Sequence, residues 1–196
     1  MSETLAYYEQ HAARFFDETV DIDMSAARAR FLAYLPPHAA ILDAGCGSGR
    51  DAAAFMAAGY RVSAFDGSPT LAAMATQRLG LDVVVKRFEE LTLTPRFDGI
   101  WACASLLHLP ARRLRDAFAR LGNGLRPRGV LYASFKYGLG ERNAGGRHFT
   151  DMNDDGLADL LTELPIFHVL EVWLAPDQRP QRSGERWLNT LLRRPE

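Results

Sequence analysis

The chain has 196 residues, of which 47% are hydrophobic and 24% are charged, and its formal net charge is −1. This length suits one α/β domain with a substantial core and is short for two domains. The near-neutral charge gives no electrostatic reason to expect nucleic acid or an anionic membrane as a partner. No apolar run approaches the roughly 18 residues that span a bilayer, and the first residues lack a signal pattern. We therefore expect a cytoplasmic protein.

Apolar residues at helical spacing predict helices over residues 4–18 and 25–35, the second of which ends at Pro36-Pro37. Strands and helices then alternate along the chain. Strands are predicted over residues 39–43, 60–66, 83–86, 97–102 and 130–135, and helices over residues 50–58, 69–79, 111–121 and 153–164. Two final apolar runs, 167–174 and 187–192, predict strands, although the second also fits a short helix.

This alternation of strands and helices predicts a mainly parallel sheet that is covered by helices on both faces. In such sheets ligands bind beyond the carboxyl ends of the strands, where the strand order reverses. We therefore expect the site at the ends of the first, second and fourth strands, which close on Asp43, Asp66 and Ala102.

A glycine-rich turn, Gly45-Cys46-Gly47-Ser48-Gly49, follows the first strand. Glycine lets the backbone approach a ligand without a Cβ atom between them. The dinucleotide fingerprint requires Gly or Ala where this chain has Arg50. The Asp43 carboxylate, two residues before the first glycine, suits a cationic ammonium group and would repel a pyrophosphate. The turn thus favours an adenosyl methyl donor over a dinucleotide.

Two cysteines, Cys46 and Cys103, each follow a predicted strand. They lack the Cys-x-x-Cys spacing of a redox pair, and no cluster of metal-type ligands accompanies them. We interpret both as small packing residues, and we expect no metal site.

Residues 41–49, Asp66, residues 97–108 and residues 125–131 together resemble the motifs of class I S-adenosylmethionine-dependent methyltransferases. The resemblance is to small bacterial methyltransferase-domain proteins, some of which are of the tellurite-resistance type. In the last motif, Arg128 stands where the family has a glycine. The resemblance implies a Rossmann-like, seven-stranded, mostly parallel sheet with helices on both faces, an antiparallel last strand and an N-terminal helical lid.

The resemblance also implies a set of residues that contact S-adenosylmethionine. Residues 43–47 would hold its methionine part, and residues 66–68 its ribose and adenine. Phe88 and Glu89 would contact the adenine amino group, and Ala102 and Ala104 would line the methionine end. The set is Asp43, Ala44, Gly45, Cys46, Gly47, Asp66, Gly67, Ser68, Phe88, Glu89, Ala102 and Ala104. A turn-capping role remains the alternative for Asp66, and plain surface charge remains the alternative for Glu89.

Candidates for the chemical step lie outside that set. His108 follows the fourth strand closely and can act as a general base, or else it caps the helix that begins near Pro110. Tyr8 from the lid and Lys136, Arg147 and His148 from a glycine-rich flap are the candidate substrate-binding residues. Core packing is the alternative for Tyr8, and an ordinary solvated loop is the alternative for the flap.

We expect residues 1–196 to form a single methyltransferase domain. It would comprise a helical lid (1–37), a cofactor-binding core (38–135), a flexible flap (136–150) and a C-terminal helix with a strand pair (151–196). The expected reaction is an SN2 transfer of a methyl group from S-adenosylmethionine to a small molecule, promoted mainly by proximity and leaving S-adenosylhomocysteine. We expect a monomer or weak homodimer. The alternatives are an NAD-dependent oxidoreductase and a non-catalytic, S-adenosylmethionine-binding regulatory module.

Overall fold

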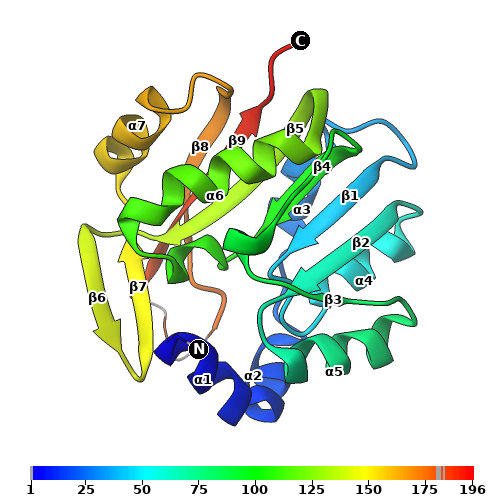
Figure 1. Cartoon of the computed structure of the whole chain (residues 1–196), viewed down its shortest axis with the longest axis vertical. Coiled ribbons are helices and arrows are strands. Elements are labelled where there is room, and N and C mark those ends of the chain that lie inside the picture. The colour runs from blue at the N-terminus through cyan, green and yellow to red at the C-terminus, as the bar shows by residue number, and fades with distance from the viewer. Residues whose placement is uncertain (1, 180–181, 183) are drawn as a thin grey trace.

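The computed structural model describes residues 2–179, 182 and 184–196, and it is built around a seven-stranded sheet (Figure 1). The strand order is β3-β2-β1-β4-β5-β9-β8. The first five strands are parallel, whereas β9 runs antiparallel to both β5 and β8. The bounds are β1 Ala40–Ala44, β2 Arg61–Asp66, β3 Val84–Val85, β4 Phe97–Ala102, β5 Leu125–Lys136, β8 His168–Pro176 and β9 Arg186–Arg193. This confirms the predicted fold class.

The strand order reverses between β1 and β4, which are hydrogen-bonded neighbours with Asp43 paired to Trp101. On the other side of β1, Ala44 pairs with Phe65 of β2. The carboxyl ends of β1, β2 and β4 therefore lie side by side, as the sequence predicted. The segment 187–192, which also fitted a helix, is part of strand β9, because both of its edges pair with strands.

Helices cover both faces of the sheet, and each face has its own apolar cluster. In Figure 1, α6 lies in front of the sheet, and α3 and α4 lie behind it. The bounds are α3 Ser25–Leu32, α4 Arg50–Ala57, α5 Pro69–Leu79, α6 Ala111–Gly124 and α7 Asp154–Thr162, with short 3-10 turns at Phe88–Glu90 (η1) and Leu106–His108 (η2). None of the helices in the described part of the chain is long and apolar enough to cross a membrane.

The N-terminal segment contains three helices where the sequence predicted two, over residues 4–18 and 25–35. Two short helices, α1 (Glu3–Gln10) and α2 (Ala12–Thr19), meet at His11 and lie below the ends of the strands in Figure 1. Helix α3 instead packs its fully buried Phe31 against Phe55 and Trp101 on the back of the sheet. Helix α3 therefore belongs to the core through Phe31, and it also lines the larger cavity near the site through Ala26, Ala27 and Arg30.

The segment predicted as a loose flap is an ordered hairpin of two strands. Strands β6 (Gly140–Ala144) and β7 (Arg147–Asp151) pair in antiparallel register, and Gly145 and Gly146 form the turn with positive φ angles. Loop composition hid this because four glycines and several charged residues are typical of solvated loops. The buried Phe149 and Thr150 anchor β7 to the body of the protein.

Phe31 tests the role of α3 as a core element. Its ring lies directly over Gly99 of β4, where an added Cβ would come within 2.5 Å of the Phe31 Cζ atom. We expect Phe31→Ala to lower the free energy of unfolding by about 3–5 kcal/mol, because it leaves a cavity against the sheet. Urea unfolding measures this, with Leu139→Ala, at 85% exposure, as the control. Equal effects of the two substitutions would contradict the assignment of α3 to the core.

Candidate functional site

The glycine turn is held in place by hydrogen bonds to the end of β2. The amides of Gly45 and Cys46 both donate to the carbonyl oxygen of Phe65 at 3.0 Å. Gly45 and Gly47 have φ angles of +77° and +54°, which residues with a Cβ atom rarely adopt. A Cβ atom at Gly45 would also lie 2.6 Å from the Ser105 Cβ atom. Glycine is therefore required here both for the turn and for the close approach of the β4 end.

Asp66 joins the turn to the beginning of α5. One carboxylate oxygen accepts from the Gly47 amide at 2.8 Å, and the other accepts from the Ser68 amide at 2.9 Å. Burial raises the pKa of Asp66, and these amide hydrogen bonds oppose the increase. The turn-capping role that was the alternative for Asp66 is thus present, and the residue also lines a cavity.

Two adjoining cavities flank the glycine turn. The larger encloses about 440 Å³ and the smaller about 160 Å³. The residues that line both come from the lid, the turn and the end of β4; they are Tyr8, Phe15, Gly45, Gly47, Ala104 and His108. A long ligand can therefore span the turn with one part in each cavity.

Four of the predicted cofactor residues line the smaller cavity and not the larger one, namely Asp66, Gly67, Phe88 and Glu89. The aromatic rings of Phe65 and Phe88, 5.4 Å apart between centroids, form one wall. Leu5 of the lid lies over Gly67, where an added Cβ would meet the leucine Cδ2 atom at 2.9 Å. The cavity is thus a flat apolar slot with a carboxylate at one end.

The larger cavity collects Asp43, Gly45, Cys46, Gly47 and Ala104 from the predicted cofactor set, and Lys136 and Arg147 from the substrate set. Ala104 has a φ angle of +52°, and its amide donates to the Ser134 hydroxyl at 2.8 Å. Four predicted residues line neither cavity: Ala44, Ser68, Ala102 and His148.

Physical reasons keep those four side chains away. Ala44 and Ala102 are fully buried in the apolar cluster beneath the sheet edge. The Ser68 hydroxyl caps α5 by accepting from the Leu71 amide, and it also contacts Glu9 of the lid. The His148 imidazole contacts the Thr150 hydroxyl at 3.2 Å, and only the His148 backbone approaches the site.

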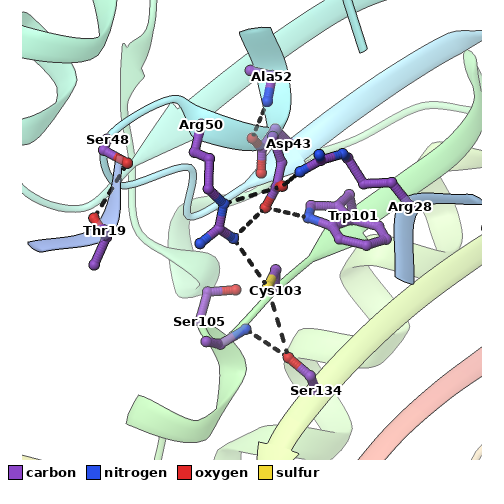
Figure 2. A network of polar contacts seen from close by, with 12 residues as sticks. Thr19, Arg28, Asp43, Ser48, Arg50, Ala52, Trp101, Cys103, Ser105 and Ser134 are labelled. Atoms are coloured by element: carbon purple, nitrogen blue, oxygen red, sulfur yellow. Dashed lines mark hydrogen bonds and ion pairs between the residues drawn. The ribbon is translucent and has the colours of Figure 1, made fainter. Parts of the chain in front are cut away.

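A buried charged network forms the wall of the larger cavity behind the turn (Figure 2). Arg50 donates through Nε and Nη2 to both carboxylate oxygens of Asp51, which also accepts from Arg28 and from the Trp101 indole. Among the described residues, the Nη1 of Arg50 has no hydrogen-bond partner, and it carries no dashed line in Figure 2. One end of this guanidinium is therefore available to a ligand.

Asp43 lies beside this network and accepts a hydrogen bond from the Ala52 amide at 3.1 Å. Burial raises its pKa well above the usual range, and the neighbouring Asp51 charge adds to the increase. A cation that entered the cavity would favour the ionised form of Asp43. Arg50 was missed as a candidate because its position in the sequence pointed only to a departure from the dinucleotide fingerprint.

His108 stands where the lid, the β4 end and the hairpin meet. Its Nδ1 lies 2.7 Å from the carbonyl oxygen of His148, and its Nε2 lies 2.7 Å from the Tyr8 hydroxyl. Burial lowers the pKa of His108 to about 4, with a further contribution from the Arg147 charge. The imidazole is therefore neutral at neutral pH, and it does not cap the helix near Pro110.

Cations and aromatic rings alternate along the opposite wall of the larger cavity. The Arg147 guanidinium lies 4.7 Å from the Tyr7 ring centroid and 5.2 Å from that of Phe149. The Lys136 ammonium lies 5.7 Å from both Phe149 and Trp187. Glu185 pairs with Lys136, whereas Arg147 has no acidic partner among the described residues. Arg147 is thus the cation of this wall that is free to meet an anionic ligand.

Comparisons with known proteins agree with this geometry. A family model described as a methyltransferase domain matches residues 41–129, which contain the turn, Asp66 and strand β4. A search of curated proteins by sequence finds no match.

Solved structures resemble the chain over nearly its whole length. The 1,6-didemethyltoxoflavin-N1-methyltransferase of Burkholderia thailandensis, with bound 1,6-didemethyltoxoflavin and S-adenosylhomocysteine, is 30% identical. The match covers 98% of this chain and 85% of that one, with a TM-score of 0.77. The N-methyltransferase NodS of Bradyrhizobium japonicum, in complex with S-adenosylhomocysteine, is 19% identical, over 96% and 98% of the two chains, with a TM-score of 0.71. The [4+2]-cyclase SpnF is 15% identical, over 100% and 97%, also with a TM-score of 0.71.

The sheet order, the glycine turn and the two flanking cavities define a Rossmann-like ligand-binding domain. Together with the 30% identity over the whole domain, they show that the chain belongs to the class I S-adenosylmethionine-dependent methyltransferases.

The lowered pKa of His108 predicts a specific dependence of stability on pH. An unfolded histidine binds a proton below about pH 6.5, whereas folded His108 stays neutral down to about pH 4. The unfolded chain therefore binds more protons between pH 6.5 and 4, and the free energy of unfolding falls as the pH falls through this window, by roughly 2–3 kcal/mol from this residue. We expect His108→Gln to remove that part of the slope in urea unfolding measured from pH 4 to 7. The exposed His168→Gln should keep it, and parallel curves for wild type and His108→Gln would contradict this environment.

Proposed function

We propose that this protein transfers a methyl group from S-adenosylmethionine to a small-molecule acceptor. The observation that carries the proposal is the pair of adjoining cavities that share the glycine turn. One is a narrow apolar slot with a carboxylate, and the other is a larger chamber with charged and aromatic walls. Their different chemistry matches a donor that spans the turn and an acceptor beside it.

The smaller cavity suits the adenosine part of the donor. Asp66 would accept from the ribose hydroxyls, because a carboxylate can accept further hydrogen bonds beyond its two amide donors. Phe65, Phe88 and Leu5 would enclose the adenine ring in apolar contact, with Gly67 beneath it and Glu89 at the rim. Asp66, Gly67, Phe88 and Glu89 are residues that the sequence predicted around the adenosine, whereas Phe65 and Leu5 come from the structure and Ser68 lies outside the cavity.

The turn side of the larger cavity suits the methionine part of the donor. This part carries both an ammonium and a carboxylate, and the cavity offers a group of opposite charge to each. Asp43 would face the ammonium, and the free Nη1 of Arg50 would donate to the carboxylate. Asp51 holds Arg50 in this orientation through two hydrogen bonds, which favours a preorganised site.

The remainder of the larger cavity would hold the acceptor. Arg147, Lys136 and Tyr8 line it together with the rings of Phe149 and Trp187. Such walls suit a flat molecule that carries negative charge or loses a proton during the reaction. The Burkholderia relative acts on a ring nitrogen of 1,6-didemethyltoxoflavin, and NodS is an N-methyltransferase. We therefore propose a nitrogen of a planar heterocycle as the acceptor atom.

The protein would contribute mainly alignment, exclusion of water and one base. S-adenosylmethionine bound at the turn supplies a methyl group on a positively charged sulfur, open to in-line SN2 displacement. Orientation of two reactants in one site can contribute several kcal/mol, up to roughly 7–11 in well-aligned cases. The lid residues Tyr8 and Phe15 cover the junction of the cavities and keep water from it. His108, which is neutral at neutral pH, is the candidate to take the acceptor proton.

A role other than methyl transfer, such as binding of the donor alone, is the second candidate, since a protein named as a [4+2]-cyclase shares this fold. The free charge of Arg147 favours an acceptor, because a protein that only bound the donor would need no unpaired cation facing the second half of the cavity. An NAD-dependent enzyme is disfavoured by Asp43, which would lie against the pyrophosphate at the turn.

Donor binding is tested by calorimetry with S-adenosylmethionine, S-adenosylhomocysteine and NAD. We expect S-adenosylmethionine and S-adenosylhomocysteine to bind and NAD to bind little or not at all. The affinity for the donor should fall at least about tenfold in Asp66→Asn, because a hydrogen bond from the ribose to a charged carboxylate contributes roughly 1.5–3 kcal/mol. The exposed Asp82→Asn is the matched control, and thermal unfolding shows whether the Asp66 variant remains folded. Tighter binding of NAD, or donor binding that does not depend on Asp66, would contradict the proposal.

Acceptor binding is tested by a screen with methyl-labelled S-adenosylmethionine over planar nitrogen heterocycles, phenols, thiols and amines. For the acceptor found, Arg147→Gln should raise KM roughly 10–100-fold and leave donor affinity unchanged, because it removes one charge-assisted contact. Arg142→Gln is the control; this arginine lies on the facing strand, pairs with Asp151 and lines neither cavity. Silence across the screen despite tight donor binding would favour the non-catalytic role.

A further inference from the structure

The tautomer of His108 follows from its two hydrogen bonds. The carbonyl oxygen of His148 has no hydrogen to donate, so the Nδ1 atom that it contacts at 2.7 Å must carry the proton. The Nε2 atom of a neutral imidazole is then an acceptor, and the Tyr8 hydroxyl at 2.7 Å must donate to it. Burial raises the pKa of Tyr8, which keeps its phenol protonated for this purpose.

The basic nitrogen of His108 is therefore already occupied by Tyr8. A molecule in the larger cavity that had a proton to lose would have to displace the phenol to reach Nε2. The phenol is held in place by the Phe15 ring at 4.9 Å and by the His108 ring at 5.4 Å between centroids. Both Tyr8 and His108 line both cavities, so they stand at the junction where donor and acceptor meet.

We propose that Tyr8 receives the proton of the acceptor and passes its own proton to His108, so that the two residues act as one relay. This proposal rests on the proposed function of the site. Tyr8 would be the residue that touches the acceptor, and His108 would be the terminal base behind it.

The transfer balances in two proton movements. The acceptor N–H or O–H bond breaks, and its proton goes to the Tyr8 oxygen; the original O–H bond of Tyr8 breaks, and that proton goes to Nε2 of His108. The electron pair left on the acceptor atom is the one that bonds to the methyl group. The imidazolium, which still donates from Nδ1 to the His148 carbonyl, later returns its extra proton to water.

The charged groups near Tyr8 and His108 have opposite effects on the two residues. The Arg147 guanidinium lies 6.0 Å from the Tyr8 ring centroid and stabilises negative charge on the phenol or the acceptor. Arg147, His148 and Lys136 all disfavour a positive charge on His108, whereas the hydrogen bond to the His148 carbonyl favours it. The nearby cations therefore favour negative charge on the phenol or the acceptor, and the His148 carbonyl is the contact that supports a protonated His108.

The relay also requires three separate elements to be docked together. Tyr8 comes from α1, His108 from η2, and the His148 carbonyl from β7. The Thr4 hydroxyl accepts from the His148 amide at 2.9 Å and so ties α1 to β7 beside the relay. A loosened lid would remove the proton donor Tyr8 and the Thr4 contact that holds the His148 backbone beside His108.

The first test reads the tautomer directly, without any acceptor. In the wild-type protein with selective ¹⁵N labelling of histidine, NMR should show His108 with the proton on Nδ1 and an unprotonated Nε2. Tyr8→Phe should shift the Nε2 resonance, whereas Tyr60→Phe should not, because Tyr60 packs against the apolar cluster behind the sheet and lines neither cavity. A proton on Nε2 in the wild type would overturn the relay whatever the activity.

The second test uses the acceptor found in the screen. We expect Tyr8→Phe and His108→Gln each to lower kcat roughly 100-fold, with donor affinity unchanged, and the double variant to be no slower than either single variant. The loss should shrink for a related acceptor that is already ionised in the assay buffer. Tyr60→Phe should keep the wild-type kcat.

The outcomes separate the relay from the function beneath it. Full activity of Tyr8→Phe, or multiplicative losses in the double variant, would overturn the relay while methyl transfer stands. A wild-type protein that binds no S-adenosylmethionine, or methylates nothing in the screen, would overturn the proposed function and the relay with it.

Discussion

The hydrogen bonds between the glycine turn and the end of β2 are the contacts on which the site depends. The Phe65 carbonyl and the Asp66 carboxylate together accept from three amides of the turn, and Asp66 also accepts from the beginning of α5. A buried carboxylate that lost these partners would be costly, so the turn and the carboxylate stabilise each other. The glycine turn also separates the two cavities. Because Gly45 and Gly47 have no Cβ atoms, the turn leaves room for the end of β4 and for the lid.

The lid shares its contacts between the two cavities. Glu9 of α1 contacts the Ser68 and Thr70 hydroxyls at the beginning of α5, beside the smaller cavity. Thr4 and Tyr8 of the same helix contact β7 and His108, beside the larger cavity. One short helix therefore contacts the margins of both cavities at once. A movement of α1 would open both cavities together.

Much of the fold and half of the site were predictable from local patterns. Alternating strands and helices, the glycine turn and Asp66 have short-range signatures, because they depend on backbone conformation and on residues close in sequence. The hairpin β6–β7 and the position of α3 were not predictable in this way, since Phe149 and Phe31 are placed by packing against distant strands. Ser68 and His148 belonged to the right segments, but their side chains are taken up by a helix cap and by Thr150.

The sequence by itself determined the family and placed the glycine turn and Asp66 at the ends of neighbouring strands, because each of these follows from contiguous motifs. The tertiary structure alone decided how the walls of the larger cavity are charged. It freed one end of Arg50 by binding the other to Asp51, left Arg147 without an acidic partner among the described residues, and placed Tyr8 on His108, 100 residues away in the chain. Arg50 and Asp51 are adjacent in the sequence, but Asp51 is also held by Arg28 and Trp101 from other elements. The contact between Tyr8 and His108 arises only when the lid, the sheet edge and the hairpin pack together.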